Sequence, residues 1–367
     1  MLALSRIHRP ALSGFEGVHN MKVAMITAAF PPIKSGGSDY ALRLAELAAD
    51  HSIEMHVLTT SRAQAQPTRS LLKIYPIANT WDWLEMKPLM AQLVALEPEV
   101  IDIHFTGWVY NDHPMITFLA TEIRKQLPDT HICVHLESLG GVRRDKGNLL
   151  DVAVRWGASF MVGREGINYE YGSLMRDCHS VIFLNERDKI ELARQFPETS
   201  DKGFLLPPPP IMPVSLPLSA GEIVDLREKH NVQNFEIVIA FYGYVYPGKG
   251  LETLFSALYH VVSKKREAGV LIIGGLPEQR VLDRSGKSNY LGDLKASLES
   301  LNLTQRVRWI GYAESSSVEP SRLLRASDIC VLPFDAGLML HNSSFSFAAM
   351  HGPFRRHPDW PMNPELA

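Results

Sequence analysis

The sequence has few cysteines, little net charge and no long hydrophobic run, and each shortage argues against a class of protein. Its three cysteines, Cys133, Cys178 and Cys330, are far apart and odd in number. They therefore favour free thiols in a reducing compartment over a disulfide framework. Cys133 and Cys330 lie inside apolar segments, so we expect them to be buried. A formal net charge of −3 gives no general attraction to nucleic acid.

No apolar segment approaches the roughly 20 residues that a membrane-spanning helix needs. Residues 1–20 lack the long apolar centre of a signal peptide, and a segment of strand character begins directly after them at Met21. We expect residues 1–20 to be a disordered leader or a misassigned start, with translation beginning at Met1 or at Met21. We expect a cytoplasmic protein. Peripheral association with a membrane stays open, since the sequence has no basic amphipathic helix strong enough to predict it.

What the sequence does contain is a regular alternation of short apolar runs with amphipathic stretches. The runs are nearly continuous in apolar residues, which is typical of parallel strands buried on both faces. Alternating strands and helices predict α/β layers. In the first half, strands are predicted at 22–28, 53–60, 98–105, 131–137 and 180–186, and helices at 39–50, 115–127 and 188–196. In the second half, strands are predicted at 236–243, 269–275, 306–312 and 328–334, and helices at 251–262, 290–301 and 320–327.

A proline-rich segment, "LLPPPPIMPVSLPLSAG", separates the two halves. Four consecutive prolines fit neither a helix nor an inner strand, and they indicate a stiff, extended connector. We therefore predict a Rossmann-like domain at 21–204, a linker at 205–220 and a second Rossmann-like domain at 221–367. A ligand cleft is expected between two such domains.

The segment "GYVYPGKG", from Gly243 to Gly250, is close to a P-loop. It lies between a predicted strand and a predicted helix, where backbone N–H groups and the helix dipole favour an anion. However, Gly250 replaces the hydroxyl that would coordinate Mg²⁺, so an NTPase is a weak alternative. A dinucleotide fingerprint is weak too, because Thr253 replaces its third glycine. Lys249 still suits a diphosphate as a point charge.

Two glycines, Gly36 and Gly37, precede the first predicted helix, and we expect Ser38 or Asp39 to cap it. Paired glycines at a helix start allow a ligand to approach the backbone closely. A tight turn that needs positive φ explains them equally well.

Polar side chains close two predicted strands of the first half: His104 closes one, and His135 and Glu137 close the next. Ligands bind at strand carboxyl ends in open α/β sheets, so His135 is a candidate to donate to a substrate hydroxyl or to move a proton. A hydrogen-bonded structural histidine is the alternative. With His113 and His131, these histidines are too scattered to predict a metal site.

Near the end of the chain, an apolar strand leads into a polar loop and then a helix near Ser344. Asp335 follows that strand, where it can accept hydrogen bonds from sugar or ribose hydroxyls, or simply form a turn. The helix N-terminus offers amides to an anion.

Taken in order, these segments resemble retaining glycosyltransferases of the GT-B fold, family 4. The resemblance rests on "MKVAMITAAFPPIKSGGSDYALRLAELA", "FYGYVYPGKGLETLFSAL" and "RVRWIGY…LLRASDICVLPFDAG", and it spans about residues 21–360. It implies metal-independent transfer of a sugar from a nucleoside-diphosphate donor to a hydroxyl of a carbohydrate or lipid-linked acceptor, as in polysaccharide or glycolipid synthesis. The resemblance implies no cofactor, since the nucleoside-diphosphate sugar is a substrate.

The resemblance also implies that the domain at 21–204 is the acceptor side and that the domain at 221–367 binds the nucleotide sugar, and it implies roles for particular residues. Lys249 would bind the donor diphosphate and His135 would approach a sugar hydroxyl. The other donor-binding and phosphate-binding residues implied are Gly36, Gly37, Gly243, Gly250, Asp335, Gly337 and Ser344.

The sequence departs from that family at three points. Tyr244 stands where relatives usually have arginine, which removes a positive charge from the leaving group. The usual pair of glutamates is not intact, because its second member falls near Phe347, although Asp335, Gly337 and Ser344 resemble a D-x-G…S form found in some relatives. The chain also ends earlier than relatives do, so the second domain is expected to be incomplete. A catalytically inactive remnant that binds a nucleotide or a partner is therefore an alternative, and a nucleotide-sugar epimerase is another.

Overall fold

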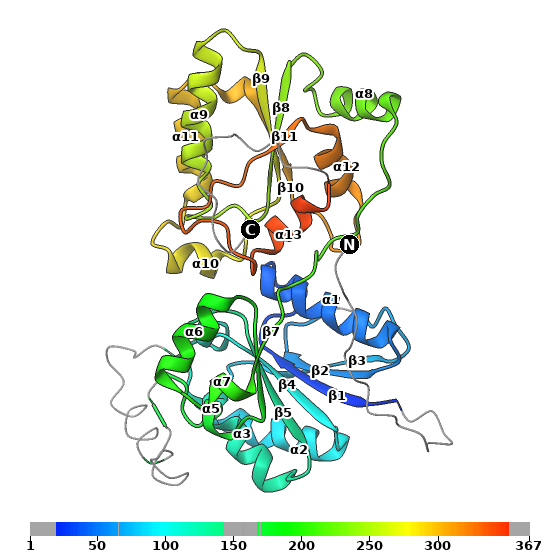
Figure 1. Cartoon of the computed structure of the whole chain (residues 1–367), viewed down its shortest axis with the longest axis vertical. Helices are drawn as coiled ribbons and strands as arrows, with labels where there is room; N and C mark the ends of the chain where they lie inside the picture. Colours follow the sequence, from blue (N-terminus) through cyan, green and yellow to red (C-terminus); the bar gives the residue numbers. More distant parts are fainter. Residues whose placement is uncertain (1–19, 65, 143–156, 158–166, 169, 352–367) are drawn as a thin grey trace.

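The computed structural model describes residues 20–64, 66–142, 157, 167, 168 and 170–351. Within them the chain forms two parallel sheets, one in each half of the molecule (Figure 1). The predicted leader lies outside the described residues except for Asn20, and so does the expected C-terminal disruption after His351.

The first sheet has seven parallel strands in the order β3-β2-β1-β4-β5-β6-β7. Five of these strands were predicted, and the inner ones among them are buried apolar runs. Two were not predicted: β3 is buried only at its two end residues and contains Pro76, and β7 has only three residues. The strands are β1 (Lys22–Thr27), β2 (Glu54–Thr60), β3 (Leu72–Ala78), β4 (Val100–Phe105), β5 (His131–Leu136), β6 (Ser180–Phe183) and β7 (Gly203–Leu205).

Helices and short 3₁₀ turns connect these strands. They are α1 (Gly36–Asp50), η1 (Trp83–Glu85), α2 (Met86–Leu96), η2 (Gly107–Tyr110), α3 (Met115–Gln126), α5 (Leu174–Asp177), α6 (Glu186–Gln195) and α7 (Thr199–Lys202). Helix α1 starts three residues earlier than predicted. Its N-cap is Ser35, whose hydroxyl accepts from the Ser38 amide at 3.1 Å, so the prediction of a Ser38 or Asp39 cap was wrong. Gly36 and Gly37 thus form the first turn of the helix.

The second sheet has four parallel strands in the order β10-β9-β8-β11. Strand β11 is shorter than predicted, because only two residues pair with β8 before the chain turns away. The elements are α8 (Ala220–Lys229), β8 (Ile237–Tyr242), α9 (Leu251–Ser263), β9 (Ala268–Ile273), α10 (Gln279–Arg284), α11 (Tyr290–Ser300), η3 (Thr304–Arg306), β10 (Val307–Gly311), α12 (Glu319–Ala326), β11 (Ile329–Cys330) and α13 (Ser343–Ala349).

The proline-rich segment runs between the sheets without regular structure from residue 206 to the start of α8. Cys133, Cys178 and Cys330 are free thiols. Cys133 is buried as predicted, whereas Cys330, on the short edge strand, is only half-buried. Among the described helices, none is both long enough and apolar enough to cross a bilayer.

Strand order reverses once in each sheet, between β1 and β4 and between β8 and β11. Loops that leave neighbouring strands in opposite directions at such a point open a crevice at the strand carboxyl ends. The loops that follow β1 and β8 carry the two glycine-rich segments singled out in the sequence. The topology therefore brings Gly36 and Lys249 to the junction of the two halves, where α1 and α13 lie close in Figure 1.

Candidate functional site

A cleft of about 270 Å³ lies at this junction, and both halves of the chain contribute to its walls. Such a volume is near the lower end of the range for small-molecule sites. The first half supplies residues that follow β1, β4, β5 and β6, and the second half supplies residues that follow β8, β9 and β11. The lining residues are Ser35, Gly36, Gly37, Tyr40, Trp108, Glu137, Leu184, Pro208, Tyr244, Tyr246, Lys249, Pro277, Val281, His341, Asn342, Ser343 and Ser344.

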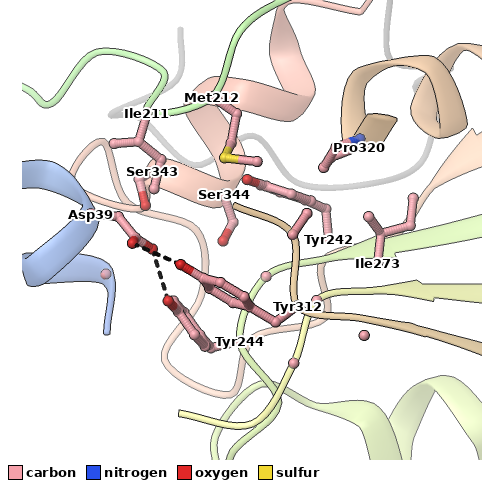
Figure 2. A pocket seen from close by; sticks show the side chains of 16 residues that line it. Asp39, Ile211, Met212, Tyr242, Tyr244, Ile273, Tyr312, Pro320, Ser343 and Ser344 are labelled. Atoms are coloured by element: carbon pink, nitrogen blue, oxygen red, sulfur yellow. Dashed lines mark hydrogen bonds between the residues drawn. The ribbon is translucent and has the colours of Figure 1, made fainter. Parts of the chain in front are cut away.

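A smaller cavity of about 50 Å³ adjoins the cleft (Figure 2). The two share Gly36, Tyr244, Ser343 and Ser344, so they lie side by side with these residues as a common wall. The small cavity extends over the carboxyl ends of β8, β9 and β10, where Gly243 lines it. The larger cavity has more room for a ligand, and we take it as the centre of the candidate site.

The turn between β8 and α9 can only be built with glycine at position 250. Gly250 has φ +71°, in the left-handed region, and it is the residue before the first turn of α9. A Cβ at this position would overlap the carbonyl oxygen of Pro333. Serine or threonine therefore does not fit, which gives a physical reason to reject the NTPase reading of this loop.

Lys249 projects from this turn into the cleft and is largely surrounded by protein. Its ammonium nitrogen lies 3.9 Å from the centre of the Phe334 ring and 5.0 Å from that of Tyr246. Burial lowers the pKa of Lys249 to about 8. No carboxylate among the described residues pairs with it, so a bound anion would supply the missing counter-charge.

Gly37 allows a carboxylate to approach the start of α1. A Cβ on Gly37 would lie 2.6 Å from Oε2 of Glu137, which follows β5. No such restriction applies to Gly36, because nothing lies within 4 Å of the corresponding point. Neither glycine has positive φ, so the alternative of a positive-φ turn is wrong for both.

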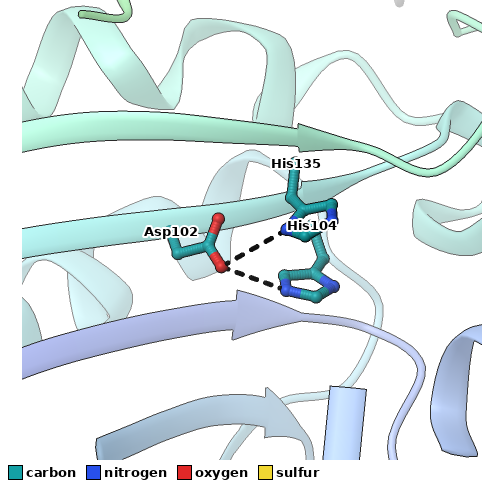
Figure 3. A group of neighbouring side chains, drawn as sticks. All are labelled: Asp102, His104 and His135. Atoms are coloured by element: carbon teal, nitrogen blue, oxygen red, sulfur yellow. Dashed lines mark hydrogen bonds and ion pairs between the residues drawn. The ribbon is translucent and has the colours of Figure 1, made fainter. Parts of the chain in front are cut away.

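His104 and His135 come together with Asp102 behind the cleft wall (Figure 3). His104 and His135 are partners in the β4-β5 register, and their rings stack with centroids 4.6 Å apart. The expectation that the histidines are too scattered to cluster was wrong for this pair. Side chains two apart on a strand share a face, so Asp102 joins them.

The contacts of these three side chains indicate which histidine carries the positive charge. His104 lies 3.1 Å from Asp102 Oδ2 through Nε2 and 3.3 Å from Glu137 Oε1 through Nδ1. Burial alone would lower the pKa of His104, but the charge of Asp102 and its hydrogen bond raise the pKa to about 9. Burial, followed by the charge of His104, lowers the pKa of His135. Because both ring nitrogens of His104 face carboxylates, it is the charged member of the pair.

His135 does not line either cavity. It is 1% exposed, and its Nε2 lies 3.0 Å from the hydroxyl of Tyr40. Tyr40 lines the cleft between His135 and any ligand. His135 therefore reaches the cleft only through the Tyr40 hydroxyl. The sequence signal for Tyr40 was weak, because it occupies an apolar position of an amphipathic helix.

The predicted residues from the end of the second sheet divide into two groups. Ser344 lines both cavities, and its hydroxyl lies beside Gly243, where a Cβ would be 2.6 Å away. Asp335 and Gly337 are exposed and line neither cavity. The amide of Asp335 donates to the carbonyl of Gly248, and Gly337 has φ +78°, so these two residues shape the turn after β11.

Tyr244, at the position where relatives usually have arginine, makes a contact between the two halves of the chain (Figure 2). Its hydroxyl donates to Asp39 Oδ2 at 2.8 Å, and Tyr312 donates to Oδ1 at 3.5 Å. Arg62 and Glu278 form a second contact across the junction, at 3.0 Å. The sequence did not predict these contacts, because their partners are more than 200 positions apart.

Asp39 is buried in this junction. Burial raises its pKa to about 6, against the lowering effect of the hydrogen bonds from Tyr244 and Tyr312. A carboxyl whose pKa is higher in the folded than in the unfolded state binds more protons when folded, so its contribution to stability falls as pH rises from about 4 to 6.

We expect the effect of Asp39→Asn on the free energy of unfolding to be more favourable above pH 6 than at pH 4, by about 2 to 3 kcal/mol. Above pH 6 wild type buries a charge at this position, whereas the amide does not. Urea unfolding of both proteins at pH 4.5 and 7.5 measures this difference. Asp50→Asn, at an exposed position on the same helix, is the control. An equal difference between Asp39→Asn and wild type at both pH values would contradict the prediction.

Comparison with known proteins agrees with this architecture. Residues 223–337 match the model of the family described as glycosyl transferases group 1. None of the curated proteins compared with the sequence matches it.

Solved structures match over most of the chain. Anabaena HepE, in complex with UDP and glucose, is 16% identical over 85% of this chain and 73% of its own, with a TM-score of 0.55. The catalytic domain of Arabidopsis thaliana starch synthase IV, bound to ADP and acarbose, is 11% identical over 86% of this chain and 78% of its own, with a TM-score of 0.57. A Rickettsia africae glycosyltransferase is 14% identical over 86% and 73%, with a TM-score of 0.55.

At these identities the solved structures establish the fold, and the family match covers the part of the chain that carries Lys249. Residues 223–337 are thus similar to the glycosyl transferases group 1 family, and as a whole the chain has the GT-B fold, with two Rossmann-like halves, that its sequence predicted.

Proposed function

We propose that this chain transfers a sugar from a nucleoside-diphosphate sugar to an acceptor hydroxyl, with retention of configuration and without a metal ion. The observation that carries the proposal is Lys249: a half-buried ammonium that faces a cleft and pairs with no described carboxylate. A diphosphate is the anion that such a group binds as a point charge.

The chemistry follows from where charge develops. When the bond between the sugar and the diphosphate breaks, negative charge accumulates on the leaving phosphate. A preorganised cation in a site with little water stabilises that charge more than water would. Lys249 is fixed against Phe334 and Tyr246, so little reorganisation is needed when the bond breaks. Ser344 lines the cleft and lies beside Gly243 of the smaller cavity, and both are proposed to contact the donor.

Tyr244 changes what the site offers to the donor. Its hydroxyl is engaged with Asp39, so this position brings no positive charge to the leaving group. Lys249 then carries more of the stabilisation than it would beside an arginine, and we expect its removal to be correspondingly costly.

A thermal-shift panel of UDP, GDP, ADP and their glucose conjugates, without added metal, tests donor binding. A ligand at about 100 times its Kd adds about 2.7 kcal/mol to the free energy of unfolding, which moves the midpoint by a few degrees. A shift with one nucleotide supports the donor site and names its base. If the folded protein shifts with none of them, the proposal fails. If a nucleotide binds but the sugar of its conjugate is never released or transferred, an inactive nucleotide-binding remnant becomes the better hypothesis.

We expect Lys249→Ala to weaken binding of the nucleotide found in that panel by roughly 10- to 1,000-fold, because a charge-assisted contact to phosphate is lost. Isothermal titration calorimetry at pH 7 measures the change. Lys295→Ala is the matched control, since Lys295 is exposed on α11 and away from the cleft. Unchanged affinity in Lys249→Ala would show that the diphosphate is bound elsewhere.

A further inference from the structure

We propose that the wall of the cleft supplied by the first half of the chain binds an uncharged, hydroxyl-rich acceptor, a neutral sugar, and rejects anionic ones. We call Tyr40, Trp108 and Glu137 the acceptor wall. The inference rests on the proposed function in one respect: it takes the Lys249 side of the cleft as the donor side. It names the chemical class of the second substrate and the residues that select it.

The carboxylate of Glu137 is the first selecting group. Its Oε1 accepts from Nδ1 of His104 at 3.3 Å, and His104 is held in place by Asp102 at 3.1 Å through its other nitrogen. Glu137 is thereby fixed from behind, while its Oε2 lies beside Gly37 at the cleft surface. The glycine leaves the space in which this oxygen sits. A carboxylate held in this way offers lone pairs to the cleft and no proton.

The hydroxyl of Tyr40 is the second selecting group, and the direction of its proton follows from its neighbours. Nδ1 of His135 makes no hydrogen bond, but it faces Oδ2 of Asp102 at 3.7 Å, and a ring proton is more favourable there than a lone pair facing a carboxylate. We therefore assign the ring proton to Nδ1. Nε2 of His135 is then an acceptor, and the Tyr40 hydroxyl, 3.0 Å away, donates to it. The only proton of Tyr40 is thus used inside the protein, and its oxygen can only accept from a ligand.

Both polar groups of the acceptor wall therefore present lone pairs to the cleft. Groups that donate hydrogen bonds, such as the hydroxyls of a sugar, complement them, whereas phosphate, sulfate or carboxylate groups bring further lone pairs and negative charge beside Glu137. Trp108, from η2, adds an aromatic surface to the same wall. A ligand with hydroxyls on its edge and apolar faces fits this combination, and that is the chemistry of a neutral sugar ring.

The cleft is consequently divided by charge. The Lys249 side carries a cation without a described carboxylate partner, and the acceptor wall carries an anion backed by the Asp102–His104 pair. A diphosphate and a neutral sugar then have separate preferred places, which orients a donor and an acceptor for transfer. The same arrangement discourages a phosphorylated sugar from occupying the acceptor wall.

Saturation-transfer NMR tests the preference, with methyl glucoside, methyl galactoside and methyl mannoside compared with glucose 6-phosphate and glucuronate. The nucleoside diphosphate from the thermal-shift panel is present throughout, so that it occupies the Lys249 side. We expect wild type to bind at least one neutral glycoside about 10-fold more tightly than either anionic sugar. Equal or tighter binding of the anionic sugars, or no binding of any glycoside, overturns the inference.

Variants assign the preference to residues. Glu137→Gln keeps the shape but removes the charge, and we expect it to weaken neutral-glycoside binding about 10-fold and to reduce the discrimination against glucose 6-phosphate. Tyr40→Phe is expected to weaken neutral binding several-fold and to reduce that discrimination less than Glu137→Gln does, because it removes a lone pair but no charge. Glu122→Gln, at a solvent-exposed pair on α3, is the matched control. Binding in Glu137→Gln within twofold of wild type would refute the role of Glu137.

The two proposals fail separately. A protein that shifts with a nucleotide but binds no neutral glycoside refutes the acceptor wall alone. A protein that shifts with no nucleotide refutes the proposed function, whatever the sugars do. Thermal unfolding of each variant, measured first, shows that a lost interaction is not lost folding.

Discussion

Replacing His104 with glutamine is expected to lower the free energy of unfolding by about 3 to 5 kcal/mol at pH 7, the range found when one partner of a buried ion pair is removed. His104 is the cation between Asp102 and Glu137, and its side chain has no solvent exposure. Glutamine can still donate one hydrogen bond but brings no charge, so Asp102 is left as an uncompensated buried carboxylate. Asp102 Oδ1 already lacks a hydrogen-bond partner, which leaves it little means of compensation.

The same pair predicts a pH dependence. Burial lowers the pKa of His104, but the charge and hydrogen bond of Asp102 outweigh it and raise the pKa to about 9. A raised folded-state pKa contributes stability that is fully present below the unfolded value of about 6.5 and is lost as pH rises through about 9. Wild type should thus lose about 3 kcal/mol between pH 6 and 9.5 that His104→Gln does not lose.

Urea unfolding at pH 6, 7 and 9.5 measures both effects. His51→Gln is the control, because His51 is exposed at the end of α1. If His104→Gln were as stable as wild type at pH 7, the cluster would be a set of neutral side chains, and the fixed carboxylate of the acceptor wall would lose its support.

The second large effect is expected for Gly250→Ala. Left-handed φ costs an alanine about 1 to 2 kcal/mol, and overlap with a packed neighbour costs about 1 to 3 kcal/mol more. The new Cβ would meet the carbonyl of Pro333, which is backbone and cannot rotate away as a side chain does. We therefore expect a loss of about 2 to 5 kcal/mol, together with displacement of Lys249 and weaker nucleotide binding.

Gly286→Ala separates the two contributions. Gly286 has φ +73°, almost the same as the +71° of Gly250, but nothing lies within 4 Å of its would-be Cβ. This control should lose only the conformational part, about 1 to 2 kcal/mol. Chemical denaturation of both variants measures the difference in their free energies of unfolding. Equal losses would mean that the backbone at Pro333 moves away from the new Cβ at no energetic cost.

Much of the fold could be predicted because local patterns and topology point the same way. The buried strands β1, β4, β5 and β8 are short apolar runs between amphipathic helices, and such runs indicate a parallel sheet. The glycine turn before α9 was predicted with its strand and helix in the right order. The strand β3 was missed because it lies at a sheet edge, where the apolar run is interrupted by exposed residues and by Pro76.

The site was predicted less completely, for a physical reason. Lys249, Gly36, Gly37 and Ser344 line the cleft because each follows a strand or opens a helix at the sheet edge, and strand ends can be read from a sequence. Asp335 also follows a strand, yet it is exposed at a turn, because being next to a strand end does not determine which way a side chain faces.

The sequence by itself determined the two α/β halves, the proline-rich connector and the glycine turn that presents Lys249, because all of these depend on residues close together in the chain. Only the tertiary structure decided that His135 lies behind Tyr40, that His104 pairs with Asp102 and Glu137, and that Tyr244 meets Asp39. These contacts depend on the register of β4 against β5 and on how the two halves pack, and both are set by the burial of many side chains together.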